Sequence, residues 1–204
     1  MKEPVKNILK LIFVGIATTV VRIIGQLSIP AGEQAVLAPS IFAQNGTMPV
    51  VFTIYGIFAY SLIAALFLLI RKRMGGNHIR QGLRYSLACC AVWIVYLWEP
   101  LPHVAPLDRI TYPVADGLAL LVMGLLLGWL FGQTSPPIKK HRLKPLALPV
   151  LIIILCFIAG RLLLYCVAGI YSSFPEKTVE TLLWCLLAGF VTACAMAWLN
   201  RYVS

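Results

Sequence analysis

The sequence predicts an all-α, polytopic membrane protein with six transmembrane helices arranged as three hairpins, and three observations predict it. Of the 204 residues, 60% are hydrophobic and only 12% are charged, whereas soluble domains carry about 25% charged residues. Six continuous apolar runs are long enough to cross a membrane, which takes about 20 helical residues. The basic residues fall in short blocks between these runs, as expected of connecting loops.

The predicted spans cover 11–29, 50–70, 85–101, 114–132, 148–171 and 181–199, within a single domain of residues 1–204. The third span is the shortest. The first exceeds the apolar core of about 7–15 residues typical of a signal peptide, so a span is favoured there. Membrane strands alternate apolar and polar residues, and these runs do not alternate.

Loop charges predict the orientation. Thirteen of the 17 basic residues lie in the N-terminus, the second connection, the fourth connection and the C-terminus. The opposite loops carry only Arg109 and Lys177, with several acidic residues near them. We therefore expect both termini in the cytoplasm and three loops outside. A bacterial plasma membrane is the expected location.

The composition and motifs exclude several function classes. The net charge of +10 follows membrane topology and forms no soluble basic face for nucleic acid. All six cysteines lie inside predicted spans, where they are expected to act as small apolar packing residues. No H-E-x-x-H, G-x-S-x-G or phosphate-binding G-x-x-x-x-G-K-[ST] motif occurs, so an enzyme is not expected and ATP use would need a partner.

The first outward loop, 31–48, is long and mildly apolar, and we expect it to lie on the membrane or fold back as a lid. Two stripes of small residues occur at i, i+4 spacing, where a second helix can approach closely. Packing inside the bundle is one explanation, and docking of a second protein is the other. The stripes consist of Gly124, Gly128 and Gly132, and of Gly189, Ala193 and Ala197.

Two arginines lie within apolar runs. Arg161 is 17 residues after Lys144 and 15 before Glu176, or about 25 Å and 22 Å along a helix. An arginine at this depth costs roughly 2.5–3.5 kcal/mol on insertion scales, so it must face protein or a wet cavity. Arg22 lies nearer the outer end, and Thr18, Arg22 and Gln26 form a polar stripe on one helical face. The sequence leaves two roles open for these arginines: binding of a ligand and structural pairing with an acid.

Further polar and aromatic residues occur at the same outer level. If the helices converge, they form a small-molecule pocket with two arginines, which suit carboxylate or phosphate groups. We therefore expect an anionic or amphipathic ligand to enter from outside. The candidate ligand-binding residues are Arg22, Gln26, Trp93, Tyr96, Glu99, His103, Asp116, Arg161 and Tyr165.

Haem is an alternative ligand. His103 is the only histidine in an outward loop and could be an axial ligand, while Arg22 or Arg161 holds the propionates. Apart from this combination, no cofactor or metal site is predicted.

In size, six-span topology and cytoplasmic termini, the chain resembles the substrate-binding S components of energy-coupling factor (ECF) transporters. S components often present an A-x-x-x-A face on the first helix, and this chain departs from that pattern, with only Gly15 and Thr19 at that spacing. The resemblance implies uptake of a vitamin-like micronutrient with a transmembrane coupling subunit and two ATPases.

A non-transporting assembly, immunity or regulatory protein is the alternative function. In that case the arginines would be structurally paired and the glycine stripes would serve packing. Membrane lipid is an expected partner in either case.

Overall fold

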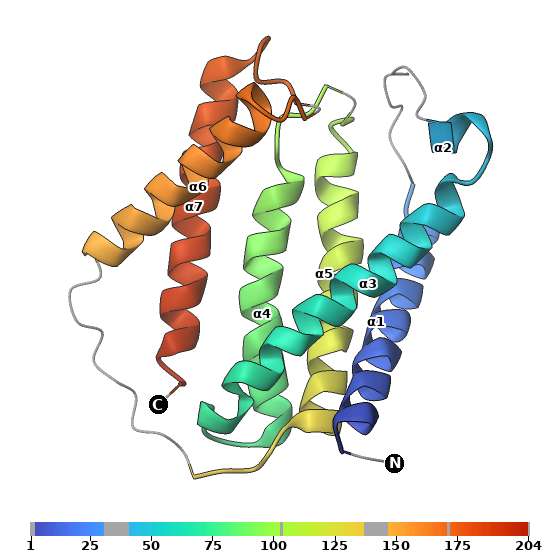
Figure 1. The fold of residues 1–204 in the computed structure, drawn as a ribbon, viewed down its shortest axis with the longest axis vertical. Coiled ribbons are helices and arrows are strands. Elements are labelled where there is room, and N and C mark those ends of the chain that lie inside the picture. The colour runs from blue at the N-terminus through green and yellow to red at the C-terminus, as the bar shows by residue number, and fades with distance from the viewer. Residues whose placement is uncertain (1–2, 31–40, 103, 137–146, 171, 204) are drawn as a thin grey trace.

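The computed structural model describes residues 3–30, 41–102, 104–136, 147–170 and 172–203. Six long helices account for most of them, and no β-strand occurs within these ranges (Figure 1). This confirms the all-α prediction. The helices are α1 (Glu3–Ser28), α3 (Met48–Ile70), α4 (His78–Leu97), α5 (Asp108–Phe131), α6 (Ala147–Cys166) and α7 (Thr178–Asn200), with a short α2 (Ile41–Gln44) and the 3-10 turn η1 (Arg71–Arg73).

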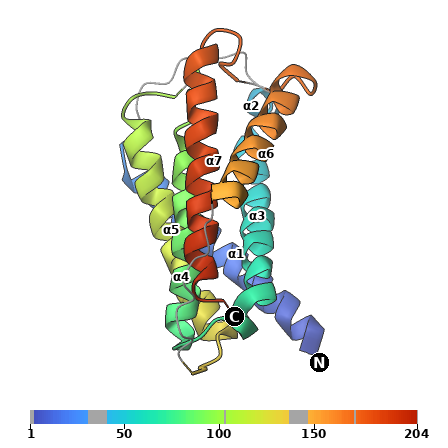
Figure 2. The same ribbon diagram turned by 90° about the vertical axis from the view of Figure 1, so that its left-hand side faces the viewer.

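The helices form a four-helix body and a C-terminal hairpin. In the body, α1 packs on α3 and α5, and α5 packs on α4. In the hairpin, α6 packs on α7, and α7 packs on α4 of the body. Figures 1 and 2 show α6 tilted at the outer edge, with α7 between it and the body. The order of packing is therefore α3–α1–α5–α4–α7–α6, which places the two membrane arginines on different parts of the molecule.

Five of the six long helices are apolar and long enough to cross a membrane: α1, α3 with η1, α5, α6 and α7. The exception is α4, the third predicted span. It begins at His78 rather than residue 85, because Asn77 caps it by accepting a hydrogen bond from the amide of Ile79 at 2.9 Å. It ends at Leu97 rather than residue 101, ahead of Pro100.

The polar first turns of α4 explain its low hydropathy. Gln81 is fully buried, and its side-chain amide donates to the carbonyls of Met74 and Gln133 at 2.7 Å each. Its own oxygen accepts from the amide of Gln133 at 3.2 Å. This one side chain thus joins the α3–α4 turn to the segment that follows α5, so its polarity serves packing at the end of the bundle.

Both ends of the chain lie at the same end of the molecule (Figure 1). Near the C-terminus, Val203 pairs with Met74 of the α3–α4 turn. Several predicted loop cations lie here too: Arg71 donates to the carbonyl of Phe131 at 3.0 Å, and the Arg84 guanidinium lies 4.0 Å from the centre of the Tyr202 ring. We call this the terminal end of the bundle.

Candidate functional site

The carboxylate of Asp116 on α5 is the centre of a polar cluster inside the body. It has no exposed surface and accepts hydrogen bonds from three side chains on two other helices. Arg22 on α1 donates through Nε at 2.8 Å, Gln26 on α1 donates at 3.3 Å, and Trp93 on α4 donates through its indole N–H at 2.7 Å. We call these four residues the Asp116 cluster.

The predicted polar stripe on the first helix faces this cluster. Thr18 is fully buried and its hydroxyl donates to the carbonyl of Val14 at 2.7 Å, so it is satisfied within α1. Close to the cluster, the Tyr60 ring of α3 lies 5.8 Å from that of Trp93. Its buried hydroxyl has no hydrogen-bond partner among the described residues. Tyr60 could not be predicted from the sequence, because an aromatic residue in an apolar run has no distinctive pattern.

Arg161 on α6 belongs to a second cluster. Its guanidinium forms an ion pair with Glu99, which lies just beyond the end of α4. The Tyr165 hydroxyl lies between them: it accepts from Arg161 Nε at 3.0 Å and donates to Glu99 at 2.6 Å. These three residues form the Glu99 cluster, which ties the hairpin to the body.

Aromatic rings surround the Arg161 guanidinium. Its central carbon lies 4.8 Å from the centre of the Tyr165 ring, 5.0 Å from that of Trp184 and 5.9 Å from that of Tyr96. Such distances favour cation–π attraction. Trp184 is fixed by its own hydrogen bond to the carbonyl of Val95 at 2.7 Å. Trp184 could not be predicted from the sequence, since nothing in its segment marks which face of the helix it occupies.

The two clusters are separate. Arg22 and Arg161 have no polar or ring contact in common among the described residues. Trp93 and Tyr96 are three residues apart on α4, yet Trp93 serves the Asp116 cluster and Tyr96 the Glu99 cluster. The expectation of one pocket with two convergent arginines therefore does not match the structure, because α1 and α6 lie on opposite sides of α4 and α5 in the packing order.

Each guanidinium is also already neutralised by an acid of the same chain. Exposure of the side chain is 22% for Arg22 and 14% for Arg161, and their carboxylate partners are 0% and 11% exposed. An incoming anion would have to replace these carboxylates. The candidate residue His103 and most of the proposed lid loop, 31–40, lie outside the described residues.

The glycine stripe on α5 packs against α4 within the chain. A Cβ added to Gly124 would lie 2.2 Å from the Ser86 hydroxyl oxygen, and one added to Gly128 would lie 2.7 Å from the carbonyl oxygen of His78. A Cβ on Gly132 would lie 2.8 Å from the His78 Cβ. These three glycines thus serve internal packing, the first of the two explanations that the sequence offered.

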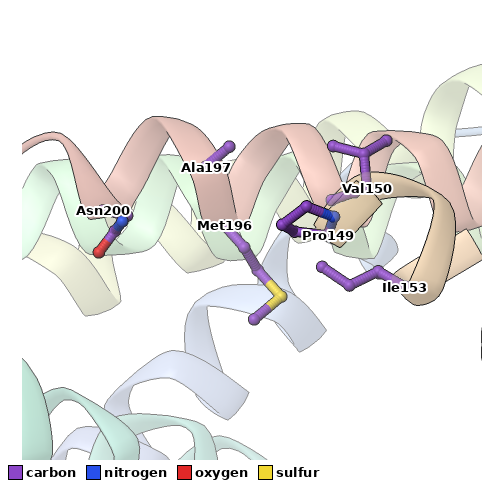
Figure 3. A pocket seen from close by; sticks show the side chains of 7 residues that line it. Pro149, Val150, Ile153, Met196, Ala197 and Asn200 are labelled. Carbon is purple, nitrogen blue, oxygen red and sulfur yellow. The ribbon is translucent and has the colours of Figure 1, made fainter. Parts of the chain in front are cut away.

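The second stripe is only partly covered. A Cβ on Gly189 would lie 3.0 Å from the Cα of Ile154 on α6, so the helices are close there. Further along α7 they separate, and Ala193 and Ala197 line a groove of about 250 Å³ between α6 and α7 (Figure 3). On the first helix, Gly15 and Thr19 face α3: a Cβ on Gly15 would lie 2.1 Å from the Ser61 hydroxyl oxygen, and Thr19 is buried.

No group of three or more His, Cys, Asp or Glu side chains able to hold a metal ion occurs in the described part of the chain. A second groove, of about 300 Å³, lies between α4 and α7 and has an almost entirely apolar lining that includes Leu87, Phe190 and Trp198. Neither groove is lined by a residue of the two clusters.

The scan against protein-family models found no match, and the searches of curated proteins and of solved structures found none either.

Proposed function

We propose that the protein is a non-transporting membrane protein with a role in assembly or regulation, and that its two buried arginines hold its own helices together. One observation carries the proposal: each arginine forms an ion pair with a carboxylate of its own chain, in two clusters that share no residue. Removing one member of such a pair leaves the other charge uncompensated in an apolar surrounding, which is strongly destabilising.

The same proposal includes the topology. All six long helices cross the membrane, α4 being shielded from lipid by α5 and α7, and both termini lie in the cytoplasm. The location of Arg71, Arg84 and Arg201 at the terminal end supports this orientation, because cytoplasmic loops are rich in Lys and Arg. Reporter fusions test it: a C-terminal fluorescent protein should be active and a C-terminal alkaline phosphatase inactive, and the reverse result contradicts it.

The outer face of α6 is the surface through which such a subunit would engage another membrane helix. Of the residues of α6, only Tyr165 is buried within the chain. Cys156 on this helix is exposed, and a Cβ added at Gly160 would have no neighbour within 4 Å. Small residues let a second helix approach closely in a membrane. Bifunctional crosslinking through Cys156 in intact membranes should therefore yield an adduct that Cys156→Ser abolishes.

Uptake of a solute by an S-component-like subunit is the second candidate. Its support is the remaining exposure of Arg22 and Arg161 and the location of the Glu99 cluster opposite the terminal end, where a solute would enter from outside. The ligand would be anionic, and it would displace Glu99 or Asp116 from its arginine. A transmembrane coupling subunit would then dock on the hairpin, because the small-residue face of α1 is covered by α3.

Single and double substitutions distinguish the two candidates. Structural pairing predicts that Arg161→Ala and Glu99→Ala each lower the melting temperature in detergent, and that the double variant recovers much of the loss. Arg109→Ala, an exposed arginine at the same end, is the control and should change nothing. Solute binding predicts instead that Arg161→Ala stays as stable as the wild type and loses a ligand that native mass spectrometry detects on the gently extracted wild-type protein.

A further inference from the structure

The groove between α6 and α7 has apolar walls and one polar end. Pro149, Val150 and Ile153 project from the first turns of α6, and Met196 and Ala197 belong to the last turns of α7 (Figure 3). Asn200 stands at the end of the groove nearest the C-terminus. Nothing in the described chain fills this space of about 250 Å³.

In the proposed topology, on which this step rests, the polar end of the groove lies at the level of a membrane surface. The 23 residues of α7 span about 34 Å, which is close to the thickness of the hydrocarbon core. Asn200 is the last residue of α7, and the exposed Arg201 follows it.

More cations lie beside Arg201. The amide of Gly75 donates to the carbonyl of Tyr202 at 3.4 Å, and Met74 pairs with Val203. These contacts place the basic turn η1, with the exposed Lys72, next to the C-terminus. Asn200, the one polar residue that lines the groove, is thus followed by a group of cations at the terminal end, which we call the cationic rim.

We infer that this groove is a binding site for an anionic phospholipid. One acyl chain lies between α6 and α7, and the phosphate group lies at Arg201 and the Asn200 amide. The charge of the rim favours an anionic headgroup, since each basic residue near a membrane surface contributes about 1 kcal/mol, or about fivefold in binding. A transmembrane helix is too wide for the site, because its diameter is about 10–12 Å with side chains.

The second groove, between α4 and α7, is a built-in comparison. It is slightly larger, at about 300 Å³, and it lacks a polar lining residue that would correspond to Asn200 in the first groove. We expect lipid chains to occupy it without regard to headgroup. Cys194 lines this second groove and Ala197 lines the first. A substitution at one of these two positions on α7 can therefore fill one groove and leave the other unchanged.

The test is native mass spectrometry of the full-length protein released from nanodiscs that contain equal amounts of phosphatidylglycerol and phosphatidylcholine with identical acyl chains. The wild type should retain phosphatidylglycerol in about fivefold excess. Ala197→Leu fills the groove and should remove most of this retained lipid, whereas Cys194→Leu should leave the excess unchanged. Arg201→Gln should reduce the excess toward equality, whereas Lys177→Gln, at the opposite end of α7, should not.

Any one of the following lipid results would overturn the inference: equal retention of both lipids by the wild type, an unchanged excess in Ala197→Leu, or equal losses in Ala197→Leu and Cys194→Leu. Thermal unfolding of each variant controls for folding. If Ala197→Leu does not fold, the Arg201→Gln and Lys177→Gln pair decides alone, because both substitutions replace exposed side chains. A co-purifying protein that excludes lipid from the groove also contradicts the inference.

Discussion

The four-helix body and the C-terminal hairpin are each held by an ion pair between an acid and an arginine, but the two pairs differ in how deeply the carboxylate is buried. In the body, Asp116 is fully buried and joins α1, α4 and α5 through charged and neutral donors. In the hairpin, Glu99 and Arg161 both retain some exposure and join only the end of α4 to α6. An acid–arginine pair thus fixes the centre of one region and attaches the edge of the other. Loss of the Arg22–Asp116 pair should therefore unfold the body, whereas loss of the Arg161–Glu99 pair should only release the hairpin from it.

Asp116→Ala tests the body and should have the largest effect. It leaves Arg22 without its carboxylate partner and leaves the Trp93 N–H without an acceptor. Breaking a buried ion pair in this way costs about 3–5 kcal/mol. We expect aggregation or a strongly lowered melting temperature in detergent, measured by size-exclusion chromatography and thermal unfolding. Glu99→Ala should cost less, and an equal or larger effect there would contradict the contrast between the two regions.

Gly82→Ala probes the helix contact inside the body and should rank second. A Cβ at Gly82 would lie 2.0 Å from the carbonyl oxygen of Gly124 and 2.5 Å from the amide nitrogen of Gly128, both rigid backbone atoms. The α4–α5 contact must open, at about 1–3 kcal/mol or more. The matched hairpin variant is Gly189→Ala, whose closest contact would be 3.0 Å to the Ile154 Cα. Thermal unfolding should show the larger loss for Gly82→Ala, and the opposite order would mean that the hairpin is packed more tightly than the body.

The sequence predicted the all-helical class, the two membrane arginines and the acids that pair with them. It could not predict which acid pairs with which arginine, because that depends on the order in which helices pack. Hydropathy does not encode this order: Trp93 and Tyr96 lie one turn apart and serve different clusters. The start of α4 was missed since its first turns are polar, although Asn77 carried a recognisable capping signal.

Tyr165→Phe tests how the hairpin is attached and should have a moderate effect. The substitution keeps the ring that lies over Arg161 and removes the hydroxyl that bonds both Arg161 and Glu99. A hydrogen bond to a charged group contributes about 1.5–3 kcal/mol, less at this partly exposed site. We expect a modestly lowered melting temperature and faster proteolysis in the α6–α7 connection, with protease protection of the body unchanged. Loss of protection in the body would show that the two regions unfold together.

Gly160→Ala should have the smallest effect on stability, and unlike the other substitutions it should not be destabilising. Gly160 lies in the middle of α6, and a Cβ there meets no atom within 4 Å, so the substitution creates no clash in the isolated chain. Alanine is favoured over glycine in a helix interior by up to about 1 kcal/mol in water. The purified protein should therefore be equally stable or slightly more stable on thermal unfolding. If the outer face of α6 binds another helix closely in the membrane, the same methyl group should weaken the Cys156 crosslink while leaving that stability intact. A stabilised protein with an unchanged crosslink would place any partner on a different face of α6, since only a helix packed over Gly160 is sensitive to its missing side chain.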